Sequence, residues 1–500
     1  MTITNPYDWV ARLAATDPAR PFLHGTDGET LGYGALDART IALTATLADL
    51  GVGEGDRILV QAEKSLGFIL LYLAALRMGA IFVPLNTAYA AGEVDYFIAD
   101  AEPALIVTSP DRAEAMASLA AGRAPVHTLG QHDDGSLLAH APQCPPPPRP
   151  TPDEHRTVAF LYTSGTTGRP KGAMLSGRNL ASNAATLASS WGFTSTDVLL
   201  HALPLFHAHG LFVGVNTTLA AGSSLILLPR FDADLVLQHL PQATVFMGVP
   251  TYYTRLLAAP GLNRDACAHM RLFVSGSAPL LAETHRAFED RTGHAILERY
   301  GMTETVMNAS NPYTGARVPG TVGPPLPGIE IIITKPETGA ELPQGEIGML
   351  EVRGPNVFSG YWRNPAKTAE DLRANGFFIT GDLARIDAQG YVHIVGRGKD
   401  LIISGGYNIY PKEIETELDQ LDGVDESAVI GVPHPDFGEA VVAFLVPRPG
   451  HSLDIASIEA ALKTRLARFK HPKFYRVLPE LPRNTMGKVM KAELRQNWKP

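Results

Sequence analysis

Short runs of Val, Ile and Leu alternate with longer stretches in which apolar residues recur at helical spacing. Compact apolar runs bounded by turn residues are typical of buried strands, and the stretches between them predict amphipathic helices. Alternation of this kind predicts α/β layers with largely parallel sheets. The strands expected in this part of the chain span residues 57–61, 104–107, 158–161, 224–228, 244–248, 272–274 and 296–298.

The most apolar early stretch, residues 66–83, is interrupted by Tyr72, Arg77 and Gly79. It is too polar for a bilayer span and predicts a buried helix followed by a strand. Residues 1–13 lack the basic-then-apolar layout of a signal peptide. We therefore expect a soluble protein with no membrane partner.

From residue 320 onward, strand patterns bounded by Gly and Pro predict a β-rich subdomain. After a charged loop near residue 396, strands at 401–404, 427–432 and 441–446 and a helix at 411–421 predict a compact α+β unit. The predicted fold class is α/β: a large N-terminal domain of α/β layers plus the β-rich subdomain, and a small mobile α+β C-terminal domain. We place the domain limits at 1–396 and 397–500.

Composition narrows the function classes. A chain of 500 residues with 45% hydrophobic content can bury a large core. Its 42 basic and 51 acidic side chains give a net charge of -9, which argues against a nucleic-acid partner. Its two cysteines, Cys144 and Cys267, exclude a disulfide scaffold or a cysteine zinc site and favour the cytoplasm.

A dense group of hydroxyls and glycines follows the strand expected at 158–161. Glycines let backbone N–H groups converge on an anion, hydroxyls donate to its oxygens, and a lysine adds charge, so the segment predicts a phosphate-binding loop. It is not a nucleotide P-loop, because Pro170 precedes Lys171 and Gly172 follows it. A plain Gly/Thr turn is the alternative. The loop residues are Thr163, Ser164, Gly165, Thr166, Thr167, Gly168 and Lys171.

Further motifs follow in order: Arg299-Tyr300-Gly301-Met302-Thr303-Glu304, Thr380-Gly381-Asp382, Gly396-Arg397-Gly398-Lys399-Asp400, Ser404-Gly405-Gly406-Tyr407-Asn408-Ile409 and Pro482-Arg483-Asn484-Thr485-Met486-Gly487-Lys488. Together with the phosphate loop, they resemble the adenylate-forming superfamily of acyl-CoA synthetases, peptide-synthetase adenylation domains and luciferases. The resemblance covers essentially the whole chain. It implies an ATP-dependent enzyme, an AMP-forming acid–thiol ligase with ATP and CoA as co-substrates.

The resemblance implies roles for individual residues around ATP. Thr303 would reach the α-phosphate, Thr163 and Glu304 would hold Mg²⁺, and Asp382 and Arg397 would bind the ribose. The alternatives are a helix N-cap for Thr303, an ordinary turn residue for Asp382 and a core position for Tyr300. Besides the phosphate loop and these residues, the expected ATP site contains Ser277, Ala278, Pro279, Glu298, Arg299, Tyr300, Gly301 and Met302.

The C-terminal motifs carry the second group of expected roles. Lys488 resembles the lysine that bridges the attacking carboxylate and the α-phosphate, although composition alone favours a surface lysine. Lysine acetylation would remove its charge, so a lysine acetyltransferase is a candidate partner. Lys399 resembles the hinge between the domains, and the strand-like segment Ser404, Gly405 and Gly406 resembles the lining of the CoA pantetheine channel.

The acid is the least constrained substrate. The segment around His207 carries no Asp for an ammonium group, and Arg255 lies on the helix expected to wall the acid pocket. A guanidinium fits a second carboxylate. With His207, Ser277 and Met302, this set resembles the malonyl-CoA synthetases and implies malonate as substrate. Alternatives are another short (di)carboxylic acid such as methylmalonate, an adenylation module that loads a carrier protein, or a non-catalytic nucleotide-binding protein.

Overall fold

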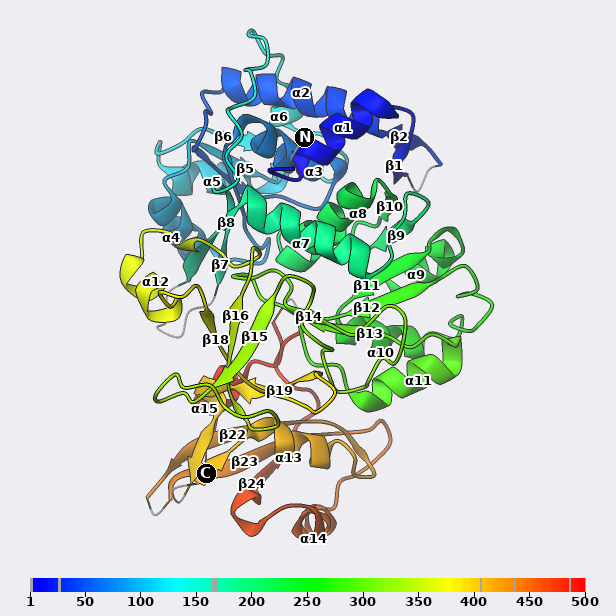
Figure 1. The fold of residues 1–500 in the computed structure, drawn as a ribbon, viewed down its shortest axis with the longest axis vertical. Helices are drawn as coiled ribbons and strands as arrows, with labels where there is room; N and C mark the ends of the chain where they lie inside the picture. Colours follow the sequence, from blue (N-terminus) through cyan, green and yellow to red (C-terminus); the bar gives the residue numbers. More distant parts are fainter. Residues whose placement is uncertain are drawn as a thin grey trace. The chain divides into compact units, whose positions relative to one another are not determined.

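The computed structural model describes residues 3–25, 28–163, 170–404, 407–435, 437–484 and 487–499 (Figure 1). The chain forms two compact units. Unit 1 comprises Met1–Glu330 and Val352–Phe378, and unit 2 comprises Ile331–Glu351 and Ile379–Pro500. The predicted domain limit at 396/397 falls within unit 2 and stays a prediction.

One sheet of unit 1 has seven strands in the order β17-β8-β7-β4-β3-β5-β6. Its first five strands along the chain are parallel, and β8 and β17 are added antiparallel at one edge. The strands are β3 (Arg57–Gln61), β4 (Ile81–Pro84), β5 (Leu105–Thr108), β6 (Val126–Thr128), β7 (Thr157–Thr163), β8 (Lys171–Ser176) and β17 (Gly360–Tyr361).

The apolar stretch at 66–83 forms a buried helix and a strand, as predicted. Helix α3 (Leu66–Met78) starts where the Ser65 hydroxyl accepts a hydrogen bond from the Phe68 N–H, and it ends at Gly79 with φ 76°. The other helices around this sheet are α1 (Tyr7–Thr16), α2 (Tyr33–Asp49), α4 (Ala91–Ala101), α5 (Ala113–Ala120) and α6 (Ser136–Ala139). Figure 1 shows them in blue and cyan.

The second sheet of unit 1 has eight strands, parallel except for its two edges. Its order is β14 (Ala309–Ser310), β13 (Leu297–Tyr300), β12 (Leu272–Ser275), β11 (Val245–Gly248), β9 (Val198–His201), β10 (Ser224–Leu227), β1 (Pro21–His24) and β2 (Thr30–Gly32). Because parallel strands end at the same edge, the loops after β9, β12 and β13 start from one side of the sheet. These loops contain His207, Ser277 and Met302 from the predicted acid pocket, together with some of the predicted ATP residues.

The helices that accompany this sheet lie in the green part of Figure 1. They are α7 (Gly177–Ser190), the π-helix η2 (His209–Val215), α8 (Asn216–Ala221), α9 (Ala233–His239), α10 (Pro250–Ala258) and α11 (Ala282–Thr292). Helix α12 (Pro365–Asp371), yellow in Figure 1, follows β17 of the seven-stranded sheet and contacts it. Tyr253, Phe273 and Phe288 join α10, β12 and α11 in one buried apolar cluster.

Unit 2 begins with the predicted β-rich part, a four-stranded sheet in the order β15-β16-β18-β19. Its strands are β15 (Glu330–Thr334), β16 (Gly348–Arg353), β18 (Phe378–Ile386) and β19 (Val392–Arg397). The short 3-10 helix η4 (Gly398–Asp400) follows β19 and contains Lys399.

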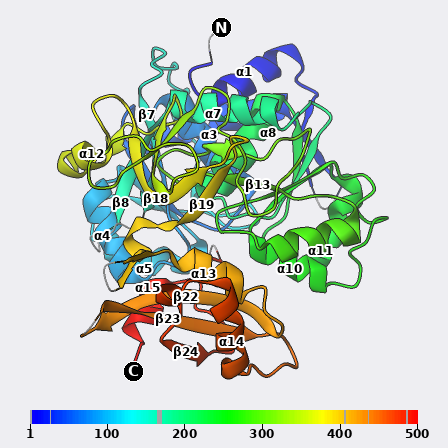
Figure 2. The same ribbon diagram turned by 60° about the horizontal axis from the view of Figure 1, so that its bottom comes forward.

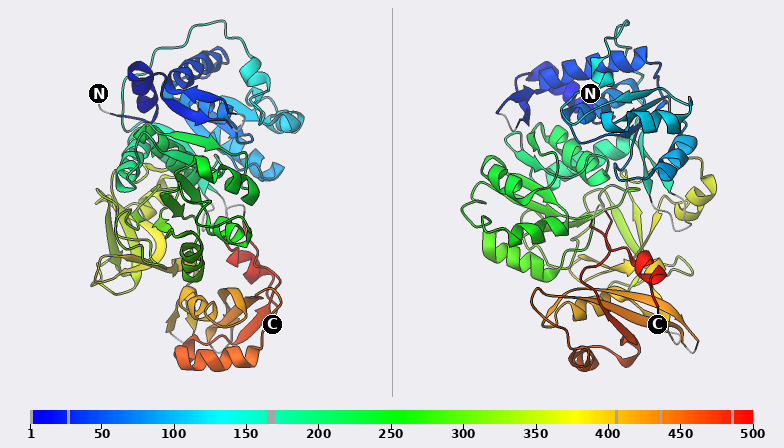
Figure 3. Two further views of the ribbon diagram at one scale, coloured as in Figure 1. Left: turned by 90° about the vertical axis from the view of Figure 1, so that its right-hand side faces the viewer. Right: turned by 180° about the vertical axis from the view of Figure 1, so that it is seen from behind.

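The C-terminal part of unit 2 is a five-stranded sheet covered on both faces (Figures 2 and 3). Helices α13 (Pro411–Leu418) and α14 (Ile455–Arg465) pack on one face, and α15 (Lys491–Gln496) packs on the other. The strands are β20 (Ile402–Ser404), β21 (Tyr407–Ile409), β22 (Val424–His434), β23 (Gly438–Pro447) and β24 (Phe474–Val477). The predicted fold class is confirmed, except that the mobility of this part stays a prediction.

None of the helices in the described ranges is long and apolar enough to cross a bilayer. The Pro-rich segment 142–152 contains no helix or strand, because proline cannot donate a backbone hydrogen bond.

Candidate active site

The hairpin of β7 and β8 brings Thr163 and Lys171 opposite each other. The loop that joins them contains Ser164, Gly165, Thr166, Thr167 and Gly168, all of which lie outside the described residues. The Lys171 ammonium lies 4.5 Å from the centre of the Tyr361 ring. Burial, followed by the charge of Lys367, lowers the pKa of Lys171. A partly desolvated cation therefore stands at one end of the predicted phosphate loop.

Glu304 is buried and lies next to this hairpin. Its Oε1 accepts hydrogen bonds from the Tyr361 hydroxyl at 3.2 Å and from Thr163 Oγ1 at 3.4 Å. Thr303 lies in a turn, not at the start of a helix, so it is not the helix N-cap considered above. Carboxylate and hydroxyl oxygens suit Mg²⁺, which usually combines one or two carboxylates with substrate phosphates. Across the described ranges, no group of three His, Cys, Asp or Glu residues is placed to hold a metal by itself.

Ser277 and His207, two of the residues predicted around the acid, are linked through His209. Ser277 has φ 70°, a left-handed conformation that is costly for a residue other than glycine. Its Oγ lies 3.2 Å from Nδ1 of His209, and the His209 N–H donates to Nδ1 of His207 at 3.2 Å. Burial, followed by the charge of Arg299, lowers the pKa of His209 well below its usual value. His209 is therefore a neutral ring at physiological pH.

Arg299 is a buried cation in the same region. Its side chain is 3% exposed, and its Nε and Nη2 atoms find no hydrogen-bond partner among the residues that the structure describes. Burial lowers its pKa to about 9. The backbone of Gly276 packs directly on it, since a Cβ atom there would stand 2.3 Å from Arg299 Cζ. Two donors of this guanidinium are therefore buried without an acceptor from the described part of the chain.

Arg255 and Met302 complete the residues expected around the acid. Arg255 lies in the last turn of α10 and is exposed, whereas Tyr253 on that helix is buried and donates to the Val274 carbonyl at 2.6 Å. Met302 is half-buried, and its sulfur lies 4.0 Å from the Tyr300 hydroxyl.

The remaining nucleotide residues of unit 1 lie on β13 and in the loops after β12 and β13. Glu298 is buried and accepts a hydrogen bond from the Leu280 N–H at 3.2 Å. Ala278 is half-buried and Pro279 is exposed. At Gly301, a Cβ atom would stand 1.8 Å from the Val306 carbonyl oxygen, so the tight loop before Thr303 requires glycine.

The predicted ribose pair lies in unit 2, where the antiparallel strands β18 and β19 place Asp382 and Arg397 opposite each other. Arg397 Nε lies 2.8 Å from Asp382 Oδ1. Asp382 is 3% exposed, and its N–H donates to Thr380 Oγ1 at 3.0 Å. The structure therefore brings the two residues together, and their contact with ribose stays a prediction.

Lys488 is exposed at the end of a tight turn in unit 2. The Gly487 N–H donates to the Asn484 carbonyl at 2.9 Å, and the Lys488 N–H donates to Asn484 Oδ1 at 3.0 Å. Arg483 donates to the Gly487 carbonyl at 2.6 Å and forms an ion pair with Glu426. Arg483 thus ties the turn that carries Lys488 to strand β22.

Two other predicted features of unit 2 are only partly described. Lys399 is exposed on η4, next to Asp400, which pairs with Arg495 at 2.7 Å. Ser404 is buried in β20, and Gly405 and Gly406 lie outside the described residues.

Sequence reasoning missed Tyr361 and gave His209 no role. No local motif marks Tyr361, which meets Glu304 because β17 pairs with β8. His209 lies two positions after His207 in the same segment, so the sequence alone could have suggested it as a second histidine of the acid pocket.

Comparison with known proteins places these features in a family. Residues 10–362 match the family described as AMP-binding enzyme, and residues 413–488 match the AMP-binding enzyme C-terminal domain. The crystal structure of ATP-bound MatB from Rhodopseudomonas palustris is 54% identical, with a TM-score of 0.94 and 98% of each chain covered. The mitochondrial malonate–CoA ligase of Mus musculus is 36% identical over 94% of this chain and 87% of its own. A feruloyl-CoA synthase from an Amycolatopsis species is 37% identical, with 98% of each chain covered.

Proposed function

The chain belongs to the family of AMP-binding enzymes, and from that premise we propose that it converts malonate and CoA to malonyl-CoA. In this reaction ATP is cleaved to AMP and pyrophosphate, and malonyl-adenylate is the intermediate. Relatives of similar identity carry names with different acids, malonate in one and ferulate in another. The choice of acid therefore has to rest on the pocket.

Arg299 is the observation that carries the choice of malonate. A buried guanidinium with two nitrogens lacking partners within the described part of the chain is costly unless a ligand supplies the missing acceptor. A short dicarboxylate supplies it with one end and presents the other end for adenylation. Ser277 and His209, which lie together beside this region, add polar contacts to the same ligand.

Arg299 was expected in the ATP site, so this role for it is new, and the residues predicted around the acid belong to the same proposal. Arg255, exposed in the last turn of α10, would attract or bind the distal carboxylate. His207 and Met302 would line the pocket. The width of the pocket decides whether a methyl group at C2 fits, so methylmalonate is the nearest alternative acid. Loading of a carrier protein is the alternative second step.

The first step needs positioning and charge neutralisation, because a carboxylate is already ionised at neutral pH. One carboxylate oxygen attacks the α-phosphorus, and pyrophosphate leaves with the bonding electron pair. Thr303 and Lys488 would donate to the oxygens on which charge accumulates. Thr163 and Glu304 offer hard oxygen atoms for Mg²⁺, which would neutralise phosphate charge when bound. The phosphate-loop residues and the adenine and ribose residues named above would hold the nucleotide.

In the second step the CoA thiolate attacks the acyl carbon, and AMP leaves. We assign the hinge to Lys399 and the pantetheine channel to Ser404, Gly405 and Gly406. Cys144 and Cys267 are both free thiols, which supports a reducing cytoplasm as the location. An acetyltransferase that modifies Lys488 would stop the first step by removing its charge.

Two substitutions test whether an arginine binds the distal carboxylate of the acid. In Arg299→Met or Arg255→Ala, a guanidinium that binds the distal carboxylate is lost, which costs about 2 to 5 kcal/mol, or roughly thirtyfold to several thousandfold in kcat/KM for malonate. Butyrate never uses that contact, so its relative efficiency rises. Arg299→Lys keeps the charge and serves as the control for folding. An unchanged malonate-to-butyrate ratio in both variants would refute the dicarboxylate assignment.

A further inference from the structure

Lys64 is a buried amine that the proposed reaction does not use. It lies between β3 and α3 and is 8% exposed. Its Nζ lies 2.9 Å from Nδ1 of His201 and 2.8 Å from the His201 carbonyl oxygen. Throughout the described ranges, no carboxylate lies within ion-pair distance of it. A lysine buried without a counter-charge favours its neutral form.

The hydrogen bonds around His201 define what Lys64 can donate. Nε2 of His201 lies 2.8 Å from the Gly210 carbonyl oxygen, so Nε2 carries the hydrogen and Nδ1 is an acceptor. A neutral Lys64 amine then gives its two hydrogens to Nδ1 and to the His201 carbonyl. The fourth tetrahedral position of its nitrogen is a lone pair. Burial lowers the pKa of Lys64 well below its usual value, and burial also lowers the pKa of His201.

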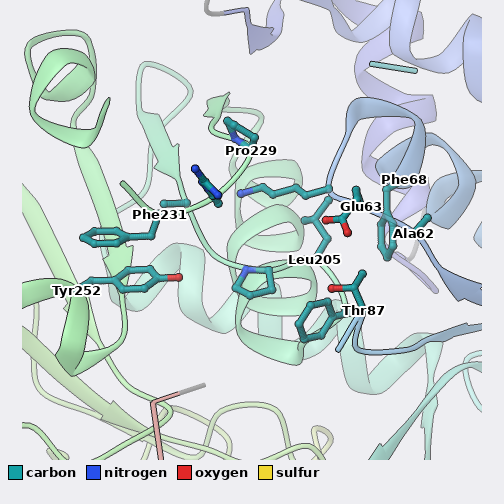
Figure 4. Close-up of a pocket in the computed structure, with 13 residues that line it drawn as sticks. Ala62, Glu63, Phe68, Thr87, Leu205, Pro229, Phe231 and Tyr252 are labelled. Carbon is teal, nitrogen blue, oxygen red and sulfur yellow. The ribbon is translucent and has the colours of Figure 1, made fainter. Parts of the chain in front are cut away.

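Lys64 lines a cavity of about 170 Å³ with mainly apolar walls. Figure 4 shows Glu63, Phe68 and Thr87 on one side of it and the stacked rings of Phe231 and Tyr252 on the other. Glu63 and Arg230 are the carboxylate and guanidinium among the lining residues, and both are exposed. The space suits a small acyl group and lies beside the segment Pro204, Leu205 and Phe206, which leads to His207.

We propose that Lys64 is an acylation site that reacts with mixed anhydrides of small carboxylic acids and phosphates. The amine lone pair attacks the acyl carbon, a C–N bond forms, and the C–O bond to phosphorus is broken. The phosphate leaves with the electron pair, and the nitrogen loses one proton to it or to water. The anhydride comes either from the enzyme's own acyl-adenylate, which rests on the proposed function, or from a free acyl phosphate.

The first arm of the test uses acetyl phosphate without ATP, with acetylation of each lysine measured by peptide mass spectrometry. Exposed Lys335 serves as the internal control. The free-amine fraction of an ordinary exposed lysine rises about tenfold per pH unit below pH 10, whereas a neutral amine reacts at a nearly constant rate. We expect Lys64 to react at least about tenfold faster at pH 7, with the ratio falling as pH rises. A ratio that does not change with pH, or no reaction at Lys64, overturns the proposal.

The second arm uses ATP, Mg²⁺ and malonate without CoA, and pyrophosphate release is measured in the same tubes. Malonyl groups on Lys64 support the enzyme's adenylate as the donor. If pyrophosphate is released but Lys64 carries no malonyl group, the adenylate is not the acyl donor. If no pyrophosphate forms, the proposed function is wrong, and the acetyl phosphate arm alone decides the reactivity of Lys64. The Lys64→Arg variant is the control for site assignment. It should show no acylation at position 64 and unchanged acylation at Lys335.

Discussion

The hydroxyl of Tyr361 donates a hydrogen bond to Oε1 of Glu304 at 3.2 Å, although 57 residues separate the two along the chain. Thr163 donates to the same oxygen at 3.4 Å, and Lys171 lies over the face of the Tyr361 ring. Tyr361 therefore contacts two groups of the proposed site. It positions Glu304, the carboxylate proposed to hold Mg²⁺, and it packs against Lys171, the cation at the end of the phosphate loop.

Tyr361→Phe keeps the ring under Lys171 and removes the hydrogen bond to Glu304. We expect the Mg²⁺ concentration at half-maximal pyrophosphate exchange to rise roughly two- to tenfold, since one hydrogen bond contributes about 0.5 to 1.5 kcal/mol. The maximal rate should change less than this. Titration of Mg²⁺ at fixed ATP measures both. Half-saturation at the wild-type concentration would mean that Tyr361 does not orient Glu304.

Lys488→Ala should abolish adenylate formation and leave thioester formation from supplied malonyl-adenylate largely intact. Arg483→Met should show a weaker form of the same defect, because the turn before Lys488 loses its tie to Glu426 and Gly487. Arg476→Met, at an exposed arginine outside this turn, is the matched control. Both half-reactions are measured separately. An equal loss of both in Arg483→Met would assign Arg483 to general stability.

Lys399→Pro locks φ at the proposed hinge and removes one backbone N–H. We expect adenylation to survive better than thioester formation, since only the second step would need a rotated C-terminal domain. Lys399→Ala keeps backbone freedom and should behave like the wild type. If proline impairs both steps equally, the hinge lies elsewhere or the variant misfolds, which its thermal unfolding would reveal.

Asp419 gives a pH prediction for unit 2. Burial raises its pKa to about 6 from 3.8, and the Ser427 hydroxyl donates to it at 2.7 Å. Between these values the folded state binds more protons than the unfolded state, so this carboxyl lowers stability as pH rises from about 4 to 6. Asp419→Asn removes that contribution, which is at most about 3 kcal/mol. Chemical unfolding at pH 4 and pH 7 should show a smaller difference in the variant than in the wild type.

Much of the fold followed from the sequence, because buried strands such as β3 and β15 are continuous apolar runs with clear ends. The position of Thr163 and Lys171 at the two ends of one loop and the pairing of Asp382 with Arg397 agree with sequence motifs, although the second strand of the hairpin, β8, was not predicted. The contacts of Tyr361 with Glu304 and of Lys64 with His201 were not predictable. They depend on how strands distant in sequence pack, and neither tyrosine nor lysine stands in a local pattern that marks a site. The burial of Arg299 was also not predictable, because it depends on the packing of the Gly276 backbone against the guanidinium.

Under the proposed function, this enzyme activates malonate and transfers it to CoA. This proposal is tested most directly by measuring pyrophosphate release and acyl-CoA formation over a panel of acetate, butyrate, malonate, methylmalonate, succinate and ferulate, with and without CoA. We expect the highest kcat/KM for malonate, and malonyl-CoA as the product when CoA is present. Preference for a monocarboxylate, or pyrophosphate release with malonate that never yields a CoA thioester, would contradict it.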